Sequence, residues 1–172
     1  MKELIIGCGK NRDKKMFGLN GDDTYHNPIT LDINPDVKPD CLWDLEDIPL
    51  PFPDNEFDEI HAYEVLEHTG NQGDYKFFFN QFTDFWRILK KDGLLIAGVP
   101  QYDSIWAWGD PSHKRIINLG SLLFLSQEEY VKQIDNDKSP MTDFRYMYKA
   151  DLKLVTYQEI NNNLLFMLRA IK

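Results

Sequence analysis

The sequence has few cysteines and no long apolar run. Cys8 and Cys41 are the two cysteines among 172 residues, too few for a disulfide framework and without the paired spacing of a zinc site. We therefore expect a protein of the reducing cytoplasm. No stretch approaches the roughly 18 apolar residues that cross a bilayer, so we expect no membrane partner.

Positive charge is also scarce. The chain has 19 Lys and Arg against 28 Asp and Glu, a formal net charge of −9. Residues 21–74 hold 15 of the acidic side chains and a single basic one. Binding to long duplex nucleic acid depends on clustered Lys and Arg that displace counterions, so we expect no such partner. The acidic region is either a solvated surface or part of a site for a cation.

Seven short apolar segments predict strands. Four of them are followed directly by glycine, aspartate or proline, which end a strand. Two segments near the end of the chain flank an Asn-rich turn, which predicts an antiparallel pair. Strands that alternate with helices or crossing segments predict an α/β fold, with a mostly parallel seven-stranded sheet and helices on both faces. The segments are residues 4–6, 29–31, 41–43, 57–62, 94–99, 152–159 and 164–171.

The clearest helix signal covers residues 75–91. Large apolar side chains recur there at spacings of three and four, which is typical of one buried helix face. Gly93 predicts the left-handed residue that ends this helix. Ser126 and Glu129 form a capping-box signature for another short helix.

A glycine turn follows the first predicted strand. Gly7 and Gly9 lack a Cβ and let the backbone of Gly7-Cys8-Gly9 approach a ligand closely. Asp32 ends the second strand, at a spacing from Gly9 suited to a carboxylate that accepts hydrogen bonds from ribose hydroxyls. Ligands of open α/β sheets bind beyond the carboxyl ends of the strands. The sequence therefore predicts a nucleoside-containing cofactor.

The type of nucleoside cofactor follows from Arg12 and from the charge. The dinucleotide fingerprint needs a third glycine at the position of Arg12, so that fingerprint fails. S-adenosylmethionine has a sulfonium cation and no phosphate, and an acidic surrounding suits it better than a pyrophosphate. These features favour S-adenosylmethionine over NAD.

Six segments in order resemble the small, type 11-like class I S-adenosylmethionine-dependent methyltransferases. The segments are residues 4–9, 31–35, 43–45, 50–60, 65–68 and 86–95. The resemblance implies a Rossmann-like methyltransferase in one domain over 1–172, with a cofactor half at 1–100 and acceptor-side loops and terminal strands at 101–172. It implies that Asp32 binds the ribose and that Asp44 and Leu45 bind the adenine edge. The full set of cofactor-binding residues that it implies is Gly7, Cys8, Gly9, Asp32, Ile33, Asp44, Leu45 and Tyr63.

Three departures from the family pattern leave other functions open. Ile5 is apolar where the family often has an acid, Asn11 replaces a common third glycine, and residues 10–25 lack the periodicity of a long helix. A catalytically silent cofactor-binding or scaffold domain is therefore the second hypothesis. A nucleotide-sugar or dinucleotide enzyme is the third, and Arg12 and the charge pattern disfavour it.

Two histidines are the candidate catalytic residues. Transfer of a methyl group to an oxygen or nitrogen requires removal of a proton from the acceptor, and histidine titrates in the right range. His68 follows the fourth predicted strand, and His113 lies in a segment that related enzymes place over the active site. The acceptor is expected to be a small molecule or the end of a polymer.

A divalent metal is a further candidate cofactor. A helix that began near Tyr63 would place Glu64, Glu67 and His68 on one face, with His113 completing the ligand set. This arrangement resembles the metal-binding helix start of small-RNA 2′-O-methyltransferases and of some quinone-precursor O-methyltransferases. Three aromatic residues after the fifth strand are candidates for stacking on the acceptor: Tyr102, Trp106 and Trp108.

Overall fold

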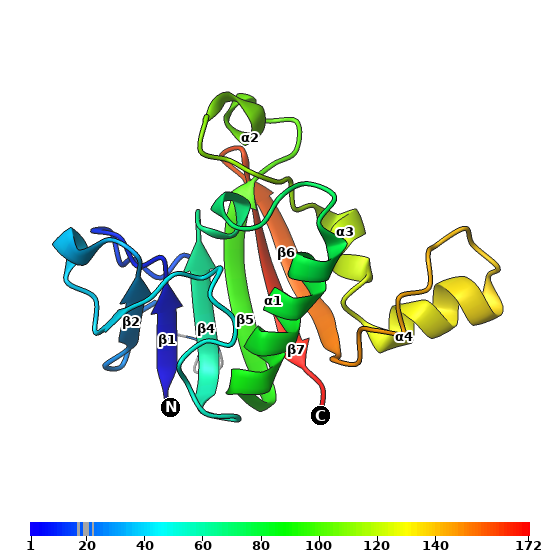
Figure 1. The fold of residues 1–172 in the computed structure, drawn as a ribbon, viewed down its shortest axis with the longest axis horizontal. Coiled ribbons are helices and arrows are strands. Elements are labelled where there is room, and N and C mark those ends of the chain that lie inside the picture. Colours follow the sequence, from blue (N-terminus) through cyan, green and yellow to red (C-terminus); the bar gives the residue numbers. More distant parts are fainter. Residues whose placement is uncertain (17, 19–20, 22) are drawn as a thin grey trace.

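The computed structural model describes residues 1–16, 18, 21 and 23–172. A seven-stranded sheet in the order β3-β2-β1-β4-β5-β7-β6 forms its centre (Figure 1). Strands β1 to β5 pair with one another in parallel, and β7 is antiparallel to both β5 and β6. The predicted sheet is therefore confirmed. Its strands are β1 (Glu3–Ile6), β2 (Ile29–Asp32), β3 (Cys41–Leu42), β4 (Phe57–Tyr63), β5 (Leu89–Pro100), β6 (Leu152–Ile160) and β7 (Asn163–Ala170).

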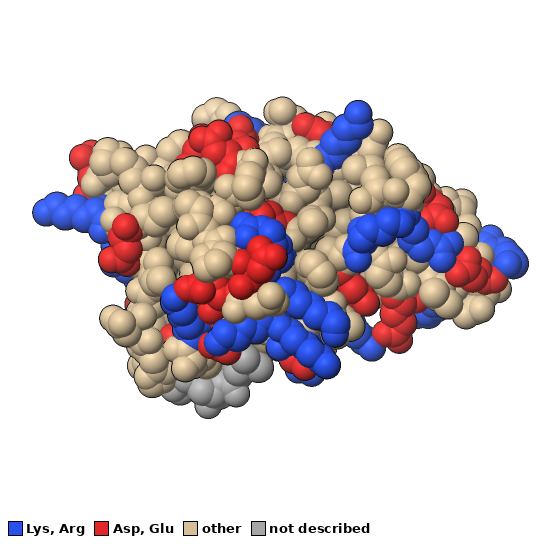
Figure 2. All heavy atoms as spheres, turned by 60° about the horizontal axis from the view of Figure 1, so that its bottom comes forward, with Lys and Arg blue, Asp and Glu red and all other residues tan. Residues whose placement is uncertain are grey.

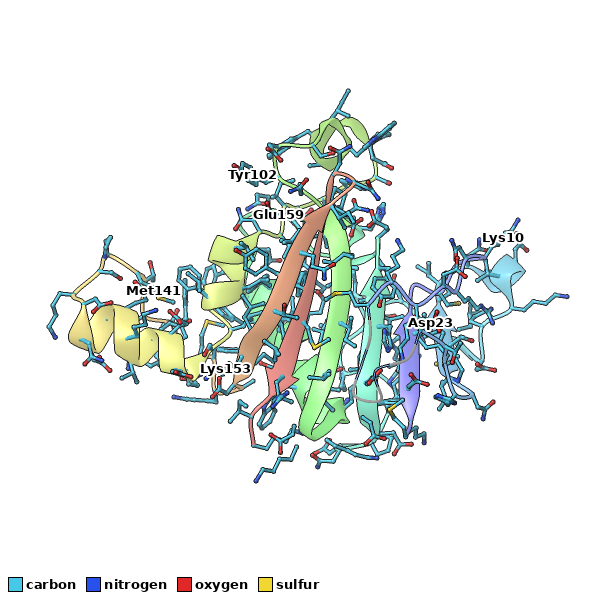
Figure 3. All side chains as sticks on the ribbon, turned by 180° about the vertical axis from the view of Figure 1, so that it is seen from behind. Lys10, Asp23, Tyr102, Met141, Lys153 and Glu159 are labelled. Carbon is cyan, nitrogen blue, oxygen red and sulfur yellow. The ribbon has the colours of Figure 1, made fainter. Side chains whose placement is uncertain are left out.

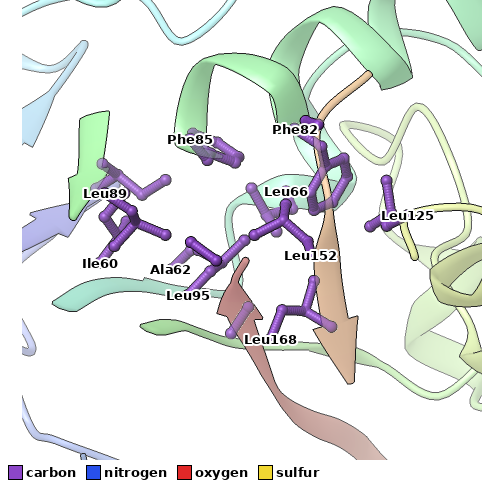
Figure 4. Packing of buried hydrophobic residues seen from close by; sticks show 14 of the residues in the cluster. Ile60, Ala62, Leu66, Phe82, Phe85, Leu89, Leu95, Leu125, Leu152 and Leu168 are labelled. Carbon is purple, nitrogen blue, oxygen red and sulfur yellow. The ribbon is translucent and has the colours of Figure 1, made fainter. Parts of the chain in front are cut away.

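Helix α1 (Tyr75–Ile88) packs on the centre of the sheet. Asp74 caps the helix by accepting a hydrogen bond from the Phe77 amide at 3.0 Å. Phe82 and Phe85 on its apolar face are buried above strand residues such as Ile60 and Leu95 (Figure 4). Complete burial of a phenylalanine side chain stabilises a fold by about 1.5–3 kcal/mol, so this face holds α1 on the sheet.

The end of α1 differs from the prediction. The helix stops at Ile88, and Leu89 is already extended and pairs with Phe57 as the first residue of β5. The left-handed residue is Asp92, at φ 62°, whereas Gly93 is not left-handed, so the predicted glycine stop is wrong. Leu89 is fully buried, and its burial in the sheet outweighs the local helix signal of the lysines that follow.

The remaining helices are short. They are α2 (Ile105–Gly109), α3 (Leu119–Leu123), α4 (Gln127–Tyr130), the π-helical turn η3 (Val131–Asn136) and the 3₁₀ turns η1 (Pro35–Val37) and η2 (Leu66–His68). Helix α2 lies beyond the carboxyl ends of the parallel strands, and α4 extends away from β6 (Figure 1). Ser126 makes no capping hydrogen bond, whereas Asn118 and Ser121 form a capping box at α3. Among the residues that the structure describes, no helix is long and apolar enough to span a bilayer.

Helices α1, α3 and α4 lie on one face of the sheet. The buried residues of α1 and α3 and Tyr130 of α4 belong to one apolar core, whereas the core on the other face consists of strand residues and Met16 (Figure 3). The expectation of helices on both faces therefore needs a correction. The described residues between β1 and β2 form no helix, in agreement with their poor apolar periodicity. Lys14 holds this segment to the sheet by a buried ion pair with Glu3, at 2.9 Å.

The acidic region is partly neutralised by basic residues from later in the chain. Asp54 pairs with Arg87 at 2.9 Å and Asp58 with Lys90 at 2.9 Å. Figure 2 shows Lys and Arg side chains next to Asp and Glu on this side of the molecule. Part of the negative charge of residues 21–74 therefore belongs to a paired surface.

Candidate functional site

A cleft of about 430 Å³ lies beyond the carboxyl ends of β1, β2 and β4. Strand β1 pairs with β2 on one side and with β4 on the other, so the direction of strand order reverses there. This is the switch point at which open α/β sheets bind ligands. The predicted site residues that line the cleft are Gly7, Asp32, Ile33, Asp44, Leu45, Glu64 and His68.

The two glycines of the turn have different roles. Both are left-handed, with φ of 60° at Gly7 and 49° at Gly9. A Cβ at Gly7 would lie 2.3 Å from Cγ2 of Val65, so packing of the loop after β4 requires this glycine. Among the described residues, a Cβ at Gly9 would meet only the Gly7 carbonyl oxygen, at 4.0 Å, which leaves space beside Gly9. Cys8 between them is buried.

Asp32 connects the glycine turn to the end of β2. One of its carboxylate oxygens accepts a hydrogen bond from the Gly9 amide at 2.9 Å, and the other accepts one from the Asn34 amide at 2.9 Å. Because an ionised carboxylate has about four acceptor positions, each oxygen can still accept a further hydrogen bond. The carboxylate therefore both holds the turn and offers acceptors to a diol in the cleft.

The residues after β2 and β3 give the cleft apolar surface next to polar groups. Leu45 is buried, whereas Ile33 is 63% exposed. The Asp44 carboxylate accepts a hydrogen bond from the Glu46 amide at 2.9 Å, and this bond orders the loop after β3. This combination suits a planar heterocycle that packs against aliphatic side chains and donates a hydrogen bond at its edge.

The side chain of Tyr63 does not line the cleft and packs on the face of the sheet away from α1. Its hydroxyl is 3.1 Å from Nδ1 of His61, and it packs against the second apolar core. Residues from β4 alternate between the two faces of the sheet, and the side chain of Tyr63 is on the rear face. The side chain of Tyr63 therefore does not line the cleft, and its predicted contact with the cofactor stays a prediction.

Glu46 and Lys114 are cleft residues that sequence reasoning missed. Their side chains form an ion pair at 2.8 Å, and Glu46 also accepts the Gly70 amide at 2.8 Å. The hydrogen bond from Lys114 is the main cause that lowers the pKa of Glu46. Lys114 is adjacent to His113 in the chain, and this proximity was the available signal.

His68 and His113 form an adjacent pair. The His68 ring lines the cleft and meets the His113 ring edge to face, with centroids 4.6 Å apart. Ser112 Oγ lies 3.1 Å from Nδ1 of His68. Burial, and then the neighbouring His113, lower the pKa of His68, so its imidazole is neutral near pH 7. A neutral imidazole on the cleft wall is the form that can accept a proton.

Glu67 is a buried carboxyl group behind the histidine pair. It is 2% exposed, and neither carboxyl oxygen makes a hydrogen bond with the part of the chain that the structure describes. Burial raises the pKa of Glu67 to about 8. Its Oε1 lies 4.0 Å from Nε2 of His113, and one ligand atom from each of Glu67, His68 and His113 lies within 4.8 Å of the others.

Glu64 lies outside that group of three. The helix expected to begin near Tyr63 does not form, because Glu64 is left-handed at φ 54° and η2 begins only at Leu66. Glu64 Oε1 is 4.0 Å from the Lys15 ammonium and has no hydrogen-bond partner among the described residues. The predicted four-residue ligand set is thus reduced to three side chains that meet, with Glu64 lining the cleft beside them.

The three candidate acceptor residues are exposed near α2. Tyr102, Trp106 and Trp108 have 60%, 64% and 72% of their surface exposed, and none of them lines the cleft. The Trp108 indole donates a hydrogen bond to the Tyr102 carbonyl at 3.2 Å. Tyr102 and Glu159 line a separate cavity of about 270 Å³ (Figure 3).

The fold and the position of the cleft define a Rossmann-like, class I methyltransferase architecture. Residues 4–97 match the methyltransferase domain family, which is more than half of the chain. The chain therefore belongs to this family of S-adenosylmethionine-dependent methyltransferases. No curated protein is similar in sequence.

Solved structures show the same fold at low sequence identity. An S-adenosylmethionine-dependent methyltransferase from Archaeoglobus fulgidus is 16% identical, with a TM-score of 0.60 over 98% of this chain and 85% of its own. The 1,6-didemethyltoxoflavin-N1-methyltransferase of Burkholderia thailandensis, solved with S-adenosylhomocysteine, is 14% identical, with a TM-score of 0.58 over 99% and 71%. The [4+2]-cyclase SpnF is 12% identical, with a TM-score of 0.55 over 99% and 75%. The fold alone therefore does not define the reaction.

Proposed function

We propose that this protein binds S-adenosylmethionine in the cleft and transfers its methyl group to an oxygen or nitrogen of a small acceptor or of a polymer end. The observation that carries the proposal is the Asp32 carboxylate, which lies at the switch point with open space beside Gly9. A ribose diol can donate to this carboxylate, and family membership gives S-adenosylmethionine as the nucleoside cofactor.

The other cleft residues fit the same cofactor. Ile33 and Leu45 supply apolar surface for the adenine ring, and Asp44 supplies an acceptor at its edge. Glu64 contributes a carboxylate near the glycine turn, where a sulfonium cation is stabilised by negative charge. When bound, the cofactor supplies a methyl group activated for in-line displacement, so alignment of the acceptor does much of the catalytic work.

His68 is the proposed general base. Its ring lines the cleft and is neutral near pH 7, so it can remove the proton of an acceptor hydroxyl or amine. The neighbouring His113 and Ser112 orient the ring. Tyr102, Trp106 and Trp108 are proposed to contact the acceptor from the side of α2, where their exposed rings are available for stacking.

A divalent metal is a second proposal, and the buried, unpaired Glu67 carboxyl favours it. Two imidazoles and one carboxylate are common ligands of transition metals, and Glu67, His68 and His113 bring one such atom each into a small volume. Thermal unfolding with Mg²⁺, Mn²⁺ or EDTA tests this proposal. We expect Mn²⁺ to raise the melting temperature of the native protein but not that of Glu67→Gln. An unchanged melting temperature in every condition would contradict it.

Isothermal titration calorimetry tests the cofactor proposal and separates the three hypotheses. S-adenosylhomocysteine should bind, and NAD should not. Loss of a charged acceptor costs about 1.5–3 kcal/mol for each hydrogen bond, so Asp32→Ala should weaken binding by roughly tenfold or more. Asp36→Ala removes an exposed carboxylate four residues away that does not line the cleft, and it should bind as the native protein does. No binding of any ligand would favour the scaffold hypothesis, and a preference for NAD would refute the proposal.

A further inference from the structure

Arg115 is a buried cation that forms no ion pair with a carboxylate among the described residues. It is 6% exposed, and no carboxylate oxygen in the described part of the chain lies within 4.0 Å of its guanidinium. Its hydrogen bonds go to three neutral acceptors: the Leu66 carbonyl at 2.9 Å, Thr69 Oγ1 at 3.0 Å and Gln81 Oε1. Glu67, Glu46 and Asp74 act on Arg115 only from beyond ion-pair distance, and burial still lowers the pKa of its guanidinium to about 10. A closer anionic partner would therefore stabilise this cation.

One nitrogen of Arg115 is left for such a partner. The three hydrogen bonds use Nε and Nη2, and Nη1 makes none with the described residues. Some polar atoms of the described residues are fully enclosed and have no hydrogen-bond partner, but Nη1 does not belong to this group. Nη1 therefore keeps some contact with open space. Of the two cavities that Arg115 lines, one holds no space for a water molecule, and the other has a volume of about 380 Å³. Arg115 therefore has a donor without a partner and lines a cavity large enough for a ligand.

The larger cavity, which we term the Arg115 cavity, has aromatic walls. It lies between the amino-terminal turn of α1 and α3, which are neighbours on the same face of the sheet (Figure 1). Phe144 is central to its wall, with ring centroids 4.9 Å from Phe79, 5.4 Å from Tyr75 and 5.9 Å from Phe124. A volume of this size suits a small organic molecule, and flat aromatic walls suit a planar one.

The amino terminus of α1 adds to the preference for an anion. Gly73, Asp74 and Tyr75 line the cavity at the start of this 14-residue helix, where the helix dipole is positive. The Asp74 carboxylate is engaged in capping the Phe77 amide at the exposed rim. The Arg115 guanidinium lies deeper, so an anionic group inserted past the rim meets the cation.

A wall of backbone separates the Arg115 cavity from the cofactor cleft. Thr69 lines the cleft, and its hydroxyl accepts the hydrogen bond from Arg115. Lys114 also lines the cleft, and the next residue lines the cavity. The Gln72 amide donates a hydrogen bond to the Lys114 carbonyl at 2.9 Å, and this bond joins the two loop segments that form the wall. The two spaces have no lining residue in common.

We propose that the Arg115 cavity is a second ligand site, which binds a planar aromatic carboxylate with its carboxylate on Arg115 and its ring among Tyr75, Phe79 and Phe144. Arginine binds carboxylates through charge-assisted hydrogen bonds that are about twice as strong as neutral ones. The inference does not depend on methyl transfer, because the site is separate from the cleft.

Ligand-observed fluorine NMR of the full chain with 4-fluorobenzoate tests the proposal. We expect saturable binding whose dissociation constant is unchanged by saturating S-adenosylhomocysteine. The neutral analogue 4-fluorobenzamide should bind at least about tenfold more weakly, because it lacks the charge that Arg115 recognises. Inorganic phosphate should not displace the fluorobenzoate, because it lacks the ring. Equal binding of the amide, displacement by phosphate or by S-adenosylhomocysteine, or no saturable binding would each overturn the proposal.

Three variants locate the binding. Arg115→Gln should weaken fluorobenzoate binding by about tenfold or more, but this residue also holds Leu66 and Thr69 and its loss can impair folding. Asn71→Trp provides an independent test, because Asn71 is exposed and lines the cavity, so a large ring there reduces the space for a ligand. It should weaken binding similarly with an unchanged melting temperature. Lys76→Gln removes an exposed cation from the same turn of α1, outside the cavity, and should bind normally. Normal binding by Asn71→Trp would refute the site.

Discussion

Substitution of Glu67 by Gln should make the stability of this protein less dependent on pH. The pKa of Glu67 is raised from 4.5 to about 8 by burial, so the folded protein keeps a proton that the unfolded chain releases. As pH rises from about 4.5 to 8, the unfolded state loses this proton first, and the folded state is progressively destabilised. Glu67→Gln has no proton to lose at this position.

The size of the effect follows from the difference in pKa. Each pKa unit corresponds to 1.36 kcal/mol, so a shift from 4.5 to about 8 gives roughly 5 kcal/mol as an upper bound at pH above 8. Glu67 is 2% exposed, so solvent screening reduces this value little. Below pH 4.5 the carboxylic acid and the amide are both neutral, and the titration contributes no difference between the two proteins.

Urea unfolding at pH 5, 7 and 8.5 in EDTA measures this effect. The free energy of unfolding of Glu67→Gln minus that of the native protein should increase with pH, by several kcal/mol over this range. The exposed Glu159→Gln is the control, and its difference from the native protein should stay constant. A difference that is independent of pH for Glu67→Gln would show that Glu67 is not held protonated by burial.

Three other predictions concern the core, the helix caps and the proposed base. Phe82→Ala should destabilise the protein by about 3–5 kcal/mol in urea unfolding, because Phe82 is fully buried between α1 and the sheet, and a cost below 1 kcal/mol would contradict this packing. Asn118→Ala should cost about 1 kcal/mol through its capping box, whereas Ser126→Ala should cost nothing, since Ser126 makes no cap hydrogen bond; equal costs would contradict the assignment. His68→Ala should retain binding of S-adenosylhomocysteine in calorimetry and slow turnover of an identified acceptor by roughly 10²–10⁴-fold, and undiminished turnover would exclude it as the base.

The sheet was predictable because its signals are local. The strand that ends at Asp32 and the strand after residue 93 have apolar runs whose burial on both faces leaves few alternatives. The end of α1 was not predictable in the same way, because Leu89 is fixed by its pairing with Phe57, which is distant in the sequence. Sequence periodicity reports local preference, and long-range pairing overrides it.

The cleft was predicted better than the groups around it. Gly7, Asp32 and Asp44 follow strand ends, and the carboxyl ends of parallel strands meet at one edge of a sheet. Glu64 was misplaced because its left-handed backbone replaces the expected helix start, and no sequence pattern marks a left-handed glutamate. Arg115 was not predicted to have a role, because its burial and its lack of an ion-pair partner are properties of the folded neighbourhood.

A crystal structure of the protein with S-adenosylhomocysteine tests the central claim most directly. The account predicts density for the ligand in the cleft beyond β1, β2 and β4, with the ribose hydroxyls within hydrogen-bond distance of the Asp32 carboxylate. The adenine ring should lie against Leu45, and the sulfur should point toward His68. A ligand bound elsewhere, or one in the cleft whose ribose makes no contact with Asp32, would contradict the account.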